Sequence, residues 1–285
     1  MIALILSIFA SVCIFVLFKL FGKFRIDTFQ AIVFNYFTAL LCGIVFFKNE
    51  WDNSALSELT WLPSVLVCAV LFISIFALMG TSSLKNGIGS TSVAAKMSMG
   101  LSMGIMIFLY KEPFTTLKVI GIVLATIGVL LVSIEKTETT SKGKSFWMLI
   151  VIFTGSVVLD VLLNYSQRYL LGSLSPSLFT AIAFGIAGII GLLTLMTRAK
   201  KNKISLKNII AGIFLGIPNF FSIYLLLEAY ETAPLNDSDV VAIINICIVC
   251  LSTLVGFICF SEKLTSQKII GIISIIFSIY LISEY

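Results

Sequence analysis

The chain has 285 residues, of which 59% are hydrophobic and only 12% are charged, with a formal net charge of +5. An ordinary soluble domain carries roughly 25% charged and about 45–50% apolar residues. The composition therefore predicts a protein whose main partner is the lipid bilayer. It excludes nucleic acid as a partner and leaves no room for a soluble enzyme head, a nucleotide-binding domain or a receptor ectodomain.

Ten apolar runs follow one another along the chain, each of roughly the length that crosses a bilayer core as a helix. The first run has no basic segment before it and no small-residue cleavage site after it, so we interpret it as a span and not as a signal peptide. The sequence predicts an all-α membrane protein of ten transmembrane helices. The runs lie at about 2–18, 29–47, 61–84, 90–110, 115–134, 146–170, 177–197, 206–228, 239–260 and 266–283.

A sequence repeat relates the two halves of the chain. KEPFTTLKVIGI at 111–122 returns as SEKLTSQKIIGI at 261–272, and each copy opens an apolar run. The polar segment 135–145 lies between the copies and has no apolar periodicity, so we expect a linker there. Five spans per half reverse the second half across the membrane, which predicts two inverted repeats, 1–134 and 146–285. The matching positions are Glu112, Thr115, Lys118, Ile120, Gly121 and Ile122 with Glu262, Thr265, Lys268, Ile270, Gly271 and Ile272.

Small residues recur at one-turn spacing inside several runs. In lipid, close backbone approach drives helix pairing, so these positions are expected to pack against neighbouring helices. Pro218 is expected to kink or break its helix because its ring removes one backbone hydrogen bond. The spaced pairs are Gly100 and Gly104, Gly121 and Ala125, and Ala181 and Gly185.

Two charged residues, Lys96 and Asp160, fall inside apolar runs. A charge at bilayer depth costs about 2.5–3.5 kcal/mol even on insertion-based scales, so it is expected to face a partner or a cavity. Asp160 shares one helix face with Ser156, Asn164 and Gln167, which follow the spacing i, i+4, i+8 and i+11. Because Lys96 and Asp160 belong to different halves, we hypothesise that they pair in a substrate-binding or proton-handling site. Two alternatives stay open, an ion pair that only fixes helix register and a Lys96 that reaches toward the membrane interface.

Further polar residues in the runs are secondary candidates for substrate binding. Each could hydrogen-bond a polar substrate, and each could equally bond a neighbouring helix. They are Asn35, Tyr36, Asn219, Tyr224 and Asn245. A group of acidic residues between the eighth and ninth runs is interpreted as a solvated loop, with a cation-attracting vestibule as the alternative. This group consists of Glu228, Glu231, Asp237 and Asp239.

The chain offers little for metal, cofactor or covalent chemistry. All six cysteines fall inside apolar runs, where Cys behaves as a small hydrophobe, and the sequence has no His. It contains no phosphate-binding loop of the G-x-x-x-x-G-K-[ST] type and none of the common hydrolase or protease motifs. We therefore expect no metal, no cofactor and no enzymatic activity.

The repeated turns carry a resemblance to a known family. Glu112–Thr115 and Ser261–Thr265 resemble the G-E-x-L-T turn of the drug/metabolite transporter superfamily, in its ten-helix branch with two EamA-type domains. Leu174–Pro176 and the segment 85–87 are also similar to that family. The resemblance implies a permease of the inner cell membrane that exports or exchanges small metabolites, often amino acids or related compounds. Transport would proceed by alternating access without ATP.

Several properties stay open at this point. Fourteen of the 19 Lys and Arg residues fall on one set of links, which predicts both termini outside the cytoplasm, whereas the resemblance implies both termini inside. A coupling proton or ion and a monomer or homodimer are both compatible with the sequence. The alternative function is a non-transporting membrane scaffold or a subunit of a membrane complex.

Overall fold

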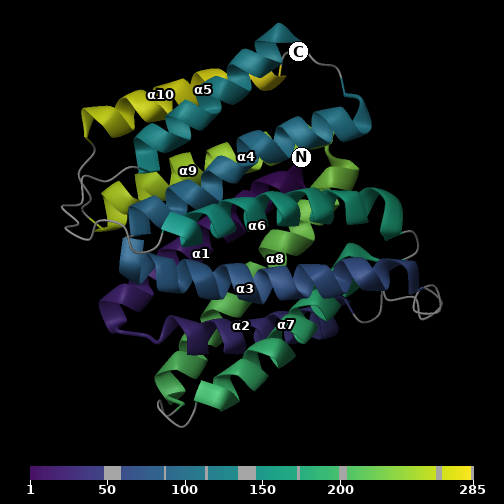
Figure 1. Ribbon diagram of the computed structural model, residues 1–285, viewed down its shortest axis with the longest axis vertical. Coiled ribbons are helices and arrows are strands. Elements are labelled where there is room, and N and C mark those ends of the chain that lie inside the picture. Colours follow the sequence, from purple (N-terminus) through teal and green to yellow (C-terminus); the bar gives the residue numbers. More distant parts are fainter. Residues whose placement is uncertain are drawn as a thin grey trace. The chain divides into compact units, whose positions relative to one another are not determined.

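The computed structural model describes residues 1–47, 59–86, 88–112, 115–133, 146–171, 174–198, 204–260 and 265–283. Within these ranges the chain forms ten α-helices and no strand, which confirms the all-α prediction (Figure 1). The helices are α1 Ile2–Phe24, α2 Thr28–Phe47, α3 Leu62–Asn86, α4 Ile88–Tyr110, α5 Thr116–Ser133, α6 Phe146–Tyr165, α7 Pro176–Arg198, α8 Leu206–Thr232, α9 Asp237–Phe260 and α10 Ser266–Ser283. A 3-10 turn, η3 Leu59–Trp61, precedes α3, and a π-helix, η4 Ser166–Leu170, continues α6. The predicted linker 135–145 and the second-half Glu262 lie outside the described residues.

Seven of the described helices are long and apolar enough to cross a membrane, namely α1, α2, α3, α6, α7, α8 and α9. The apolar stretches of the other three are shorter, at Ala94–Tyr110, Thr116–Leu131 and Ser266–Ser278. The structure thus bears out a membrane protein with several spans. That α4, α5 and α10 also cross the bilayer stays a prediction, as does the inverted orientation of the two halves.

The chain forms two compact units, each assembled from both halves of the sequence. Unit 1 comprises Met1–Ala77 and Leu162–Thr232, and unit 2 comprises Leu78–Val161 and Ala233–Tyr285. Helices α3 and α6 each contribute residues to both units. The predicted sequence repeats, 1–134 and 146–285, describe a different division of the chain and remain a prediction.

Unit 1 is built around α2, which packs against both α7 and α8, while α1 also packs against α8. Glycines allow these contacts to be close. A Cβ on Gly216 would lie 2.6 Å from the carbonyl oxygen of Asn35, and one on Gly43 would lie 2.5 Å from the Cβ of Ala181. A Cβ on Gly185 would lie 3.3 Å from Leu40, so the predicted packing face of α7 is confirmed.

Two sequence expectations about helix shape and packing are corrected in part. Helix α8 runs from Leu206 to Thr232 through Pro218, so the proline does not break it, and a kink at Pro218 stays a prediction. Among the described residues, no atom lies within 4 Å of the place where a Cβ on Gly104 would lie, whereas a Cβ on Gly100 would meet Thr126 at 2.9 Å. One-turn spacing identifies a helix face, but it does not say how far along that face a neighbouring helix follows.

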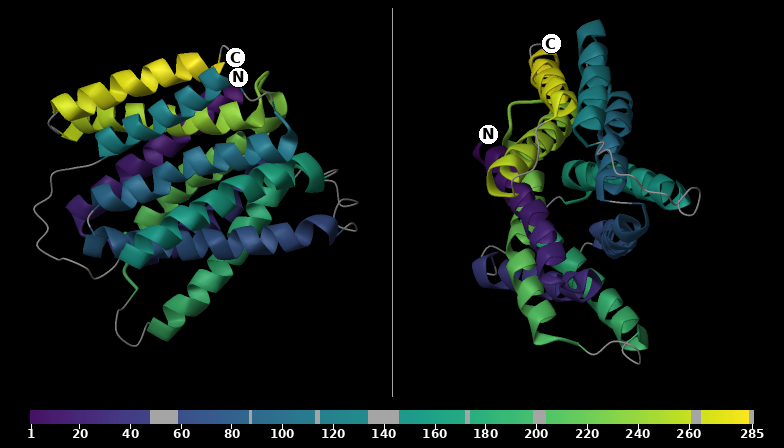
Figure 2. Two further views of the ribbon diagram at one scale, coloured as in Figure 1. Left: turned by 45° about the horizontal axis from the view of Figure 1, so that its top comes forward. Right: turned by 90° about the vertical axis from the view of Figure 1, so that its left-hand side faces the viewer.

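Unit 2 contains the two repeated turns and the helices that they start. Helix α5 packs along α10, and α4 packs against both α5 and α9 (Figures 1 and 2). The hydroxyl of Thr115 accepts a hydrogen bond from the backbone N–H of Lys118 at 3.2 Å, and Thr265 does the same for Lys268 at 3.3 Å. Both threonines are therefore N-caps, which satisfy backbone donors that the first turn leaves free. The sequence repeat is thus also a repeat of local structure.

Candidate functional site

Asp160 lies on α6 in unit 2, where two serines of α4 face its carboxylate. The hydroxyl of Ser102 lies 3.1 Å from Oδ2 of Asp160, and the hydroxyl of Ser98 lies 3.5 Å from the same oxygen. Each serine has a second acceptor, because Ser98 reaches the carbonyl of Ala95 at 2.7 Å and Ser102 reaches the carbonyl of Ser98 at 2.9 Å. A hydroxyl has one hydrogen to donate. The backbone carbonyls are the nearer acceptors, so the carboxylate is only weakly satisfied.

Lys96 lies two residues before Ser98 on α4, and its side chain reaches α9. Its ammonium group donates a hydrogen bond to Oδ1 of Asn245 at 3.1 Å, and Asn245 in turn donates to the carbonyl of Val241 at 3.0 Å. Lys96 and Asp160 also interact electrostatically. The structure therefore gathers three sequence-predicted candidates, Lys96, Asp160 and Asn245, within one unit.

Four predicted candidates lie in unit 1 and are fully or almost fully buried. Asn35, Tyr36 and Asn164 are 0% exposed, and Asn219 is 3% exposed. The ring of Tyr36 stacks on Phe184 with a centroid distance of 5.5 Å. Each of the four carries a buried polar atom that finds no hydrogen-bond partner among the described residues.

The remaining candidates have less distinctive surroundings. Gln167 donates to the carboxylate of Glu231 at 3.3 Å near an exposed end of unit 1. Tyr224 stacks on Phe220 with rings 6.0 Å apart and nearly parallel. Ser156 is half-buried on α6. The face predicted on α6 thus divides, since Ser156 and Asp160 belong to unit 2 and Asn164 and Gln167 to unit 1.

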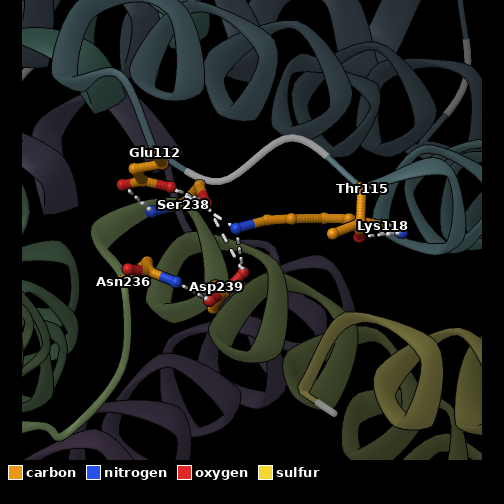
Figure 3. A network of polar contacts seen from close by, with 6 residues as sticks. All are labelled: Glu112, Thr115, Lys118, Asn236, Ser238 and Asp239. Carbon is orange, nitrogen blue, oxygen red and sulfur yellow. Dashed lines mark hydrogen bonds and ion pairs between the residues drawn. The ribbon is translucent and has the colours of Figure 1, made fainter. Parts of the chain in front are cut away.

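A second charged network in unit 2 was not predicted from the sequence. The ammonium group of Lys118 lies 2.8 Å from Oδ1 of Asp239 and 3.4 Å from Oε2 of Glu112 (Figure 3). Glu112 also accepts hydrogen bonds from the hydroxyl of Ser238 and, at 3.3 Å, from its backbone N–H. Asn236 donates to Asp239 at 2.9 Å. Glu112 therefore caps the N-terminus of α9 from the α4–α5 turn, where the helix dipole favours an anion.

This network corrects the interpretation of the acidic group as a solvated loop. Asp239 is only 4% exposed, and it lies in the first turn of α9 instead of in a loop. The sequence signal that could have identified this network is the lysine that recurs as Lys118 and Lys268. A lysine in the first turn of an apolar helix needs a partner for its charge. Both lysines are buried, at 1% and 8% exposure. The sequence could not say which acid approaches Lys118.

Among the described residues, buried charged side chains occur in unit 2, whereas both units bury neutral polar side chains. Unit 2 buries Lys118, Asp239 and Lys268 among its described residues. In the described part of unit 1, every buried polar side chain is uncharged. These are Ser7, Gln30, Asn35, Ser64, Asn164, Ser166, Ser177, Thr180, Asn208, Asn219 and Ser222.

Comparison with known proteins identifies the family. The model of the EamA-like transporter family matches residues 145–284. The chain is also 30% identical over 292 residues to an uncharacterized protein of Haemophilus influenzae, a match that covers 99% of this chain and 98% of that relative. The protein belongs to the EamA-like transporter family. The resemblance to the drug/metabolite transporter superfamily is therefore confirmed.

Family membership settles the broad class. This EamA protein is a membrane protein of a transporter family, with a small molecule and the lipid bilayer as partners. It also shares its fold with a protein of known crystal structure, at a TM-score of 0.76 and 13% identity over 98% of this chain and 94% of the other. The matched segment is the predicted second repeat, and an EamA-type domain in residues 1–134 stays a prediction.

Proposed function

We propose that this EamA protein is a secondary-active permease of the inner cell membrane that moves a small metabolite by alternating access, without ATP. Asp160 is the group that we assign to substrate or proton binding. The observation that carries the proposal is its carboxylate, which lies on an apolar helix and, within the described residues, faces two serine hydroxyls that have nearer backbone acceptors and interacts electrostatically with Lys96. A structural carboxylate is normally fully hydrogen-bonded, because burying a charge without partners is unfavourable. A weakly satisfied carboxylate is available to exchange partners during transport.

The surroundings of Asp160 favour an amino acid or a related compound as the substrate. A carboxylate and the ammonium group of Lys96 lie in the same unit, and Asn245 orients that ammonium group. An amino acid carries both charges, so Asp160 would bind its ammonium group and Lys96 its carboxylate. A site with one charge of each sign binds such a zwitterion without leaving a net buried charge.

Helix pairing is consistent with alternating access between inverted repeats. Helices that occupy the same position in the two halves are packed together, α2 with α7, α4 with α9 and α5 with α10. A pseudo-two-fold axis between inverted repeats brings such pairs together. The coupling proton or ion, the oligomeric state and the side of the membrane that holds the termini remain predictions. A reporter fused after Tyr285 would test the last of these.

The proposal is tested by substituting Asp160→Asn and measuring amino-acid counterflow in proteoliposomes. We expect the wild-type protein to exchange at least one labelled amino acid and the variant to exchange it at least about tenfold more slowly, the range of effect expected when a charge-assisted hydrogen bond is lost. Asp237→Asn removes the same charge from the half-buried first turn of α9 and is the matched control, expected to keep wild-type flux.

Two outcomes would contradict the proposal. Equal flux in folded Asp160→Asn and wild-type protein would remove Asp160 from the mechanism. An absence of flux for every amino acid in folded wild-type protein would instead favour another substrate class or the scaffold alternative.

A further inference from the structure

One end of unit 1 gathers basic side chains from two helices that are far apart in the sequence. Lys23 lies in the last turn of α1, and Arg25 is the residue that caps the end of this helix. Lys207 lies in the first turn of α8, and its ammonium group donates a hydrogen bond to the carbonyl oxygen of Phe24, the last residue of α1. All three basic side chains are exposed. We call Lys23, Arg25 and Lys207 together the basic end of unit 1.

Hydrogen bonds join the α1–α2 turn to the segment that opens α8. The backbone N–H of Asp27 donates to Oδ1 of Asn208 at 3.1 Å, and Nδ2 of Asn208 donates to Oε1 of Gln30 at 2.9 Å. The same oxygen of Gln30 accepts from the backbone N–H of Ser205 at 3.3 Å. Gln30 and Asn208 are buried, so water does not compete for these bonds. The backbone segments that carry the basic end are therefore fixed to one another.

The positive charge of the basic end is not balanced by nearby acids of the described chain. Among the described residues, neither Lys23 nor Arg25 forms an ion pair with a carboxylate. Asp27 is close in sequence, but its Oδ1 accepts from two backbone N–H groups at 3.0 and 3.1 Å and so caps the start of α2. The acids of α8, Glu228 and Glu231, lie roughly 30 Å farther along that helix, at 1.5 Å per residue. The basic end is thus a surface that favours an external anion.

Exposed apolar side chains stand directly beside these charges. Phe24 is 54% exposed, Ile204 is 47% exposed and Leu206 is 70% exposed. A basic surface next to large apolar side chains is typical of chain segments that lie at the boundary between lipid headgroups and acyl chains. A soluble anion would match only the charges. A phospholipid matches both features, because its phosphate lies above its own acyl chains.

We infer that the basic end of unit 1 binds the headgroup phosphate of an anionic phospholipid, while the apolar side chains beside it contact the acyl chains of the same lipid. Each basic residue near an anionic membrane surface strengthens binding about fivefold. Lys207 keeps donors for the phosphate, because an ammonium group has three and the carbonyl of Phe24 takes one. A lipid bound there would join the end of α1 to the start of α8. This binding requires no transport, so it stands or falls independently of the proposed function.

The test titrates the purified full-length protein in neutral detergent with phosphatidylglycerol, which is anionic, or phosphatidylcholine, which is zwitterionic, and follows the melting temperature. We expect only phosphatidylglycerol to stabilise wild-type protein. The double variant Lys23→Gln, Arg25→Gln should need at least about tenfold more of this lipid for half of the effect, since two contributions of about fivefold are lost. Lys111→Gln, Arg168→Gln removes the same charge from exposed positions elsewhere and is the matched control, expected to titrate like wild type.

Each variant is compared with itself with and without lipid, so a change in its intrinsic stability does not obscure the result. Equal stabilisation of wild-type protein by the two lipids would overturn the inference, as would equal titrations of the two double variants. Glycerol 3-phosphate is the soluble headgroup probe, and stabilisation by it as large as by the lipid would assign the surface to a free anion. Raising the salt concentration is expected to weaken the phosphatidylglycerol effect, because salt screens exposed charges. An effect that salt leaves unchanged would also contradict the inference.

Discussion

Replacing Lys118 by Met is expected to lower the free energy of unfolding by about 3–5 kcal/mol, the usual consequence of removing one partner from a buried ion pair. Lys118 is 1% exposed and holds two carboxylates, Asp239 at 2.8 Å and Glu112 at 3.4 Å, which are themselves almost completely buried. Without the lysine, two negative charges would face each other with no cation between them. Thermal unfolding of purified protein, with detergent and pH held constant, measures the effect.

A charge-matched control and a rescue distinguish this explanation from simple loss of a side chain. Lys111→Met removes the same charge from an exposed position at the end of α4 and is expected to change stability little. The triple variant Glu112→Gln, Lys118→Met and Asp239→Asn removes the charges together, so we expect it to recover much of the stability lost by Lys118→Met. A triple variant as unstable as the single one would show that packing of the lysine stem, and not charge balance, dominates.

Gly216→Ala is expected to disrupt the contact between α8 and α2 and to reduce the yield of folded protein severely. Its new Cβ would lie 2.6 Å from the carbonyl oxygen of Asn35 and 2.5 Å from the Cβ of Thr38. Overpacking costs typically about 1–3 kcal/mol, and more where the neighbour is backbone and cannot turn away, so we expect at least the upper end of that range. Size-exclusion profiles and melting temperatures in detergent measure the loss.

Gly104→Ala is the matched control, because no described atom lies within 4 Å of its Cβ position. Alanine is favoured over glycine within a helix by roughly 0.5–1 kcal/mol, so this variant is expected to be as stable as wild type or slightly more stable. Equal melting temperatures for the two variants would contradict the close α2–α8 contact.

The prediction of the helices succeeded because each one depends on a local property. The eighth run was expected at 206–228, and α8 spans Leu206–Thr232. The fifth run was expected at 115–134, and α5 spans Thr116–Ser133. A backbone at bilayer depth must satisfy its polar groups within the segment, so long apolar runs become helices whatever lies beside them. The repeated turns that open α5 and α10 were also recognised from the sequence, and the structure shows that Thr115 and Thr265 in these turns cap their own helices.

Reasoning from local sequence properties identified only part of the candidate site. Lys96 and Asp160 were identified because a charge within an apolar run is conspicuous. The serines that face Asp160, Ser98 and Ser102, were not identified, because serines are common in such helices and only a neighbouring carboxylate gives these two a role. Glu112 and Ser238 are 126 positions apart, and no sequence pattern relates residues at that separation.

The sequence by itself determined that the chain is a helical membrane protein, where most of its helices lie, and that Lys96 and Asp160 would need partners, because hydrophobicity acts over a few neighbouring residues. Only the tertiary structure decided that Lys118 is neutralised by Asp239, that α8 packs on α2 through Gly216, and that the side-chain amide of Asn164 finds no hydrogen-bond partner among the described residues. Those facts depend on which helix faces come together, and that choice is made by close packing summed over the whole chain.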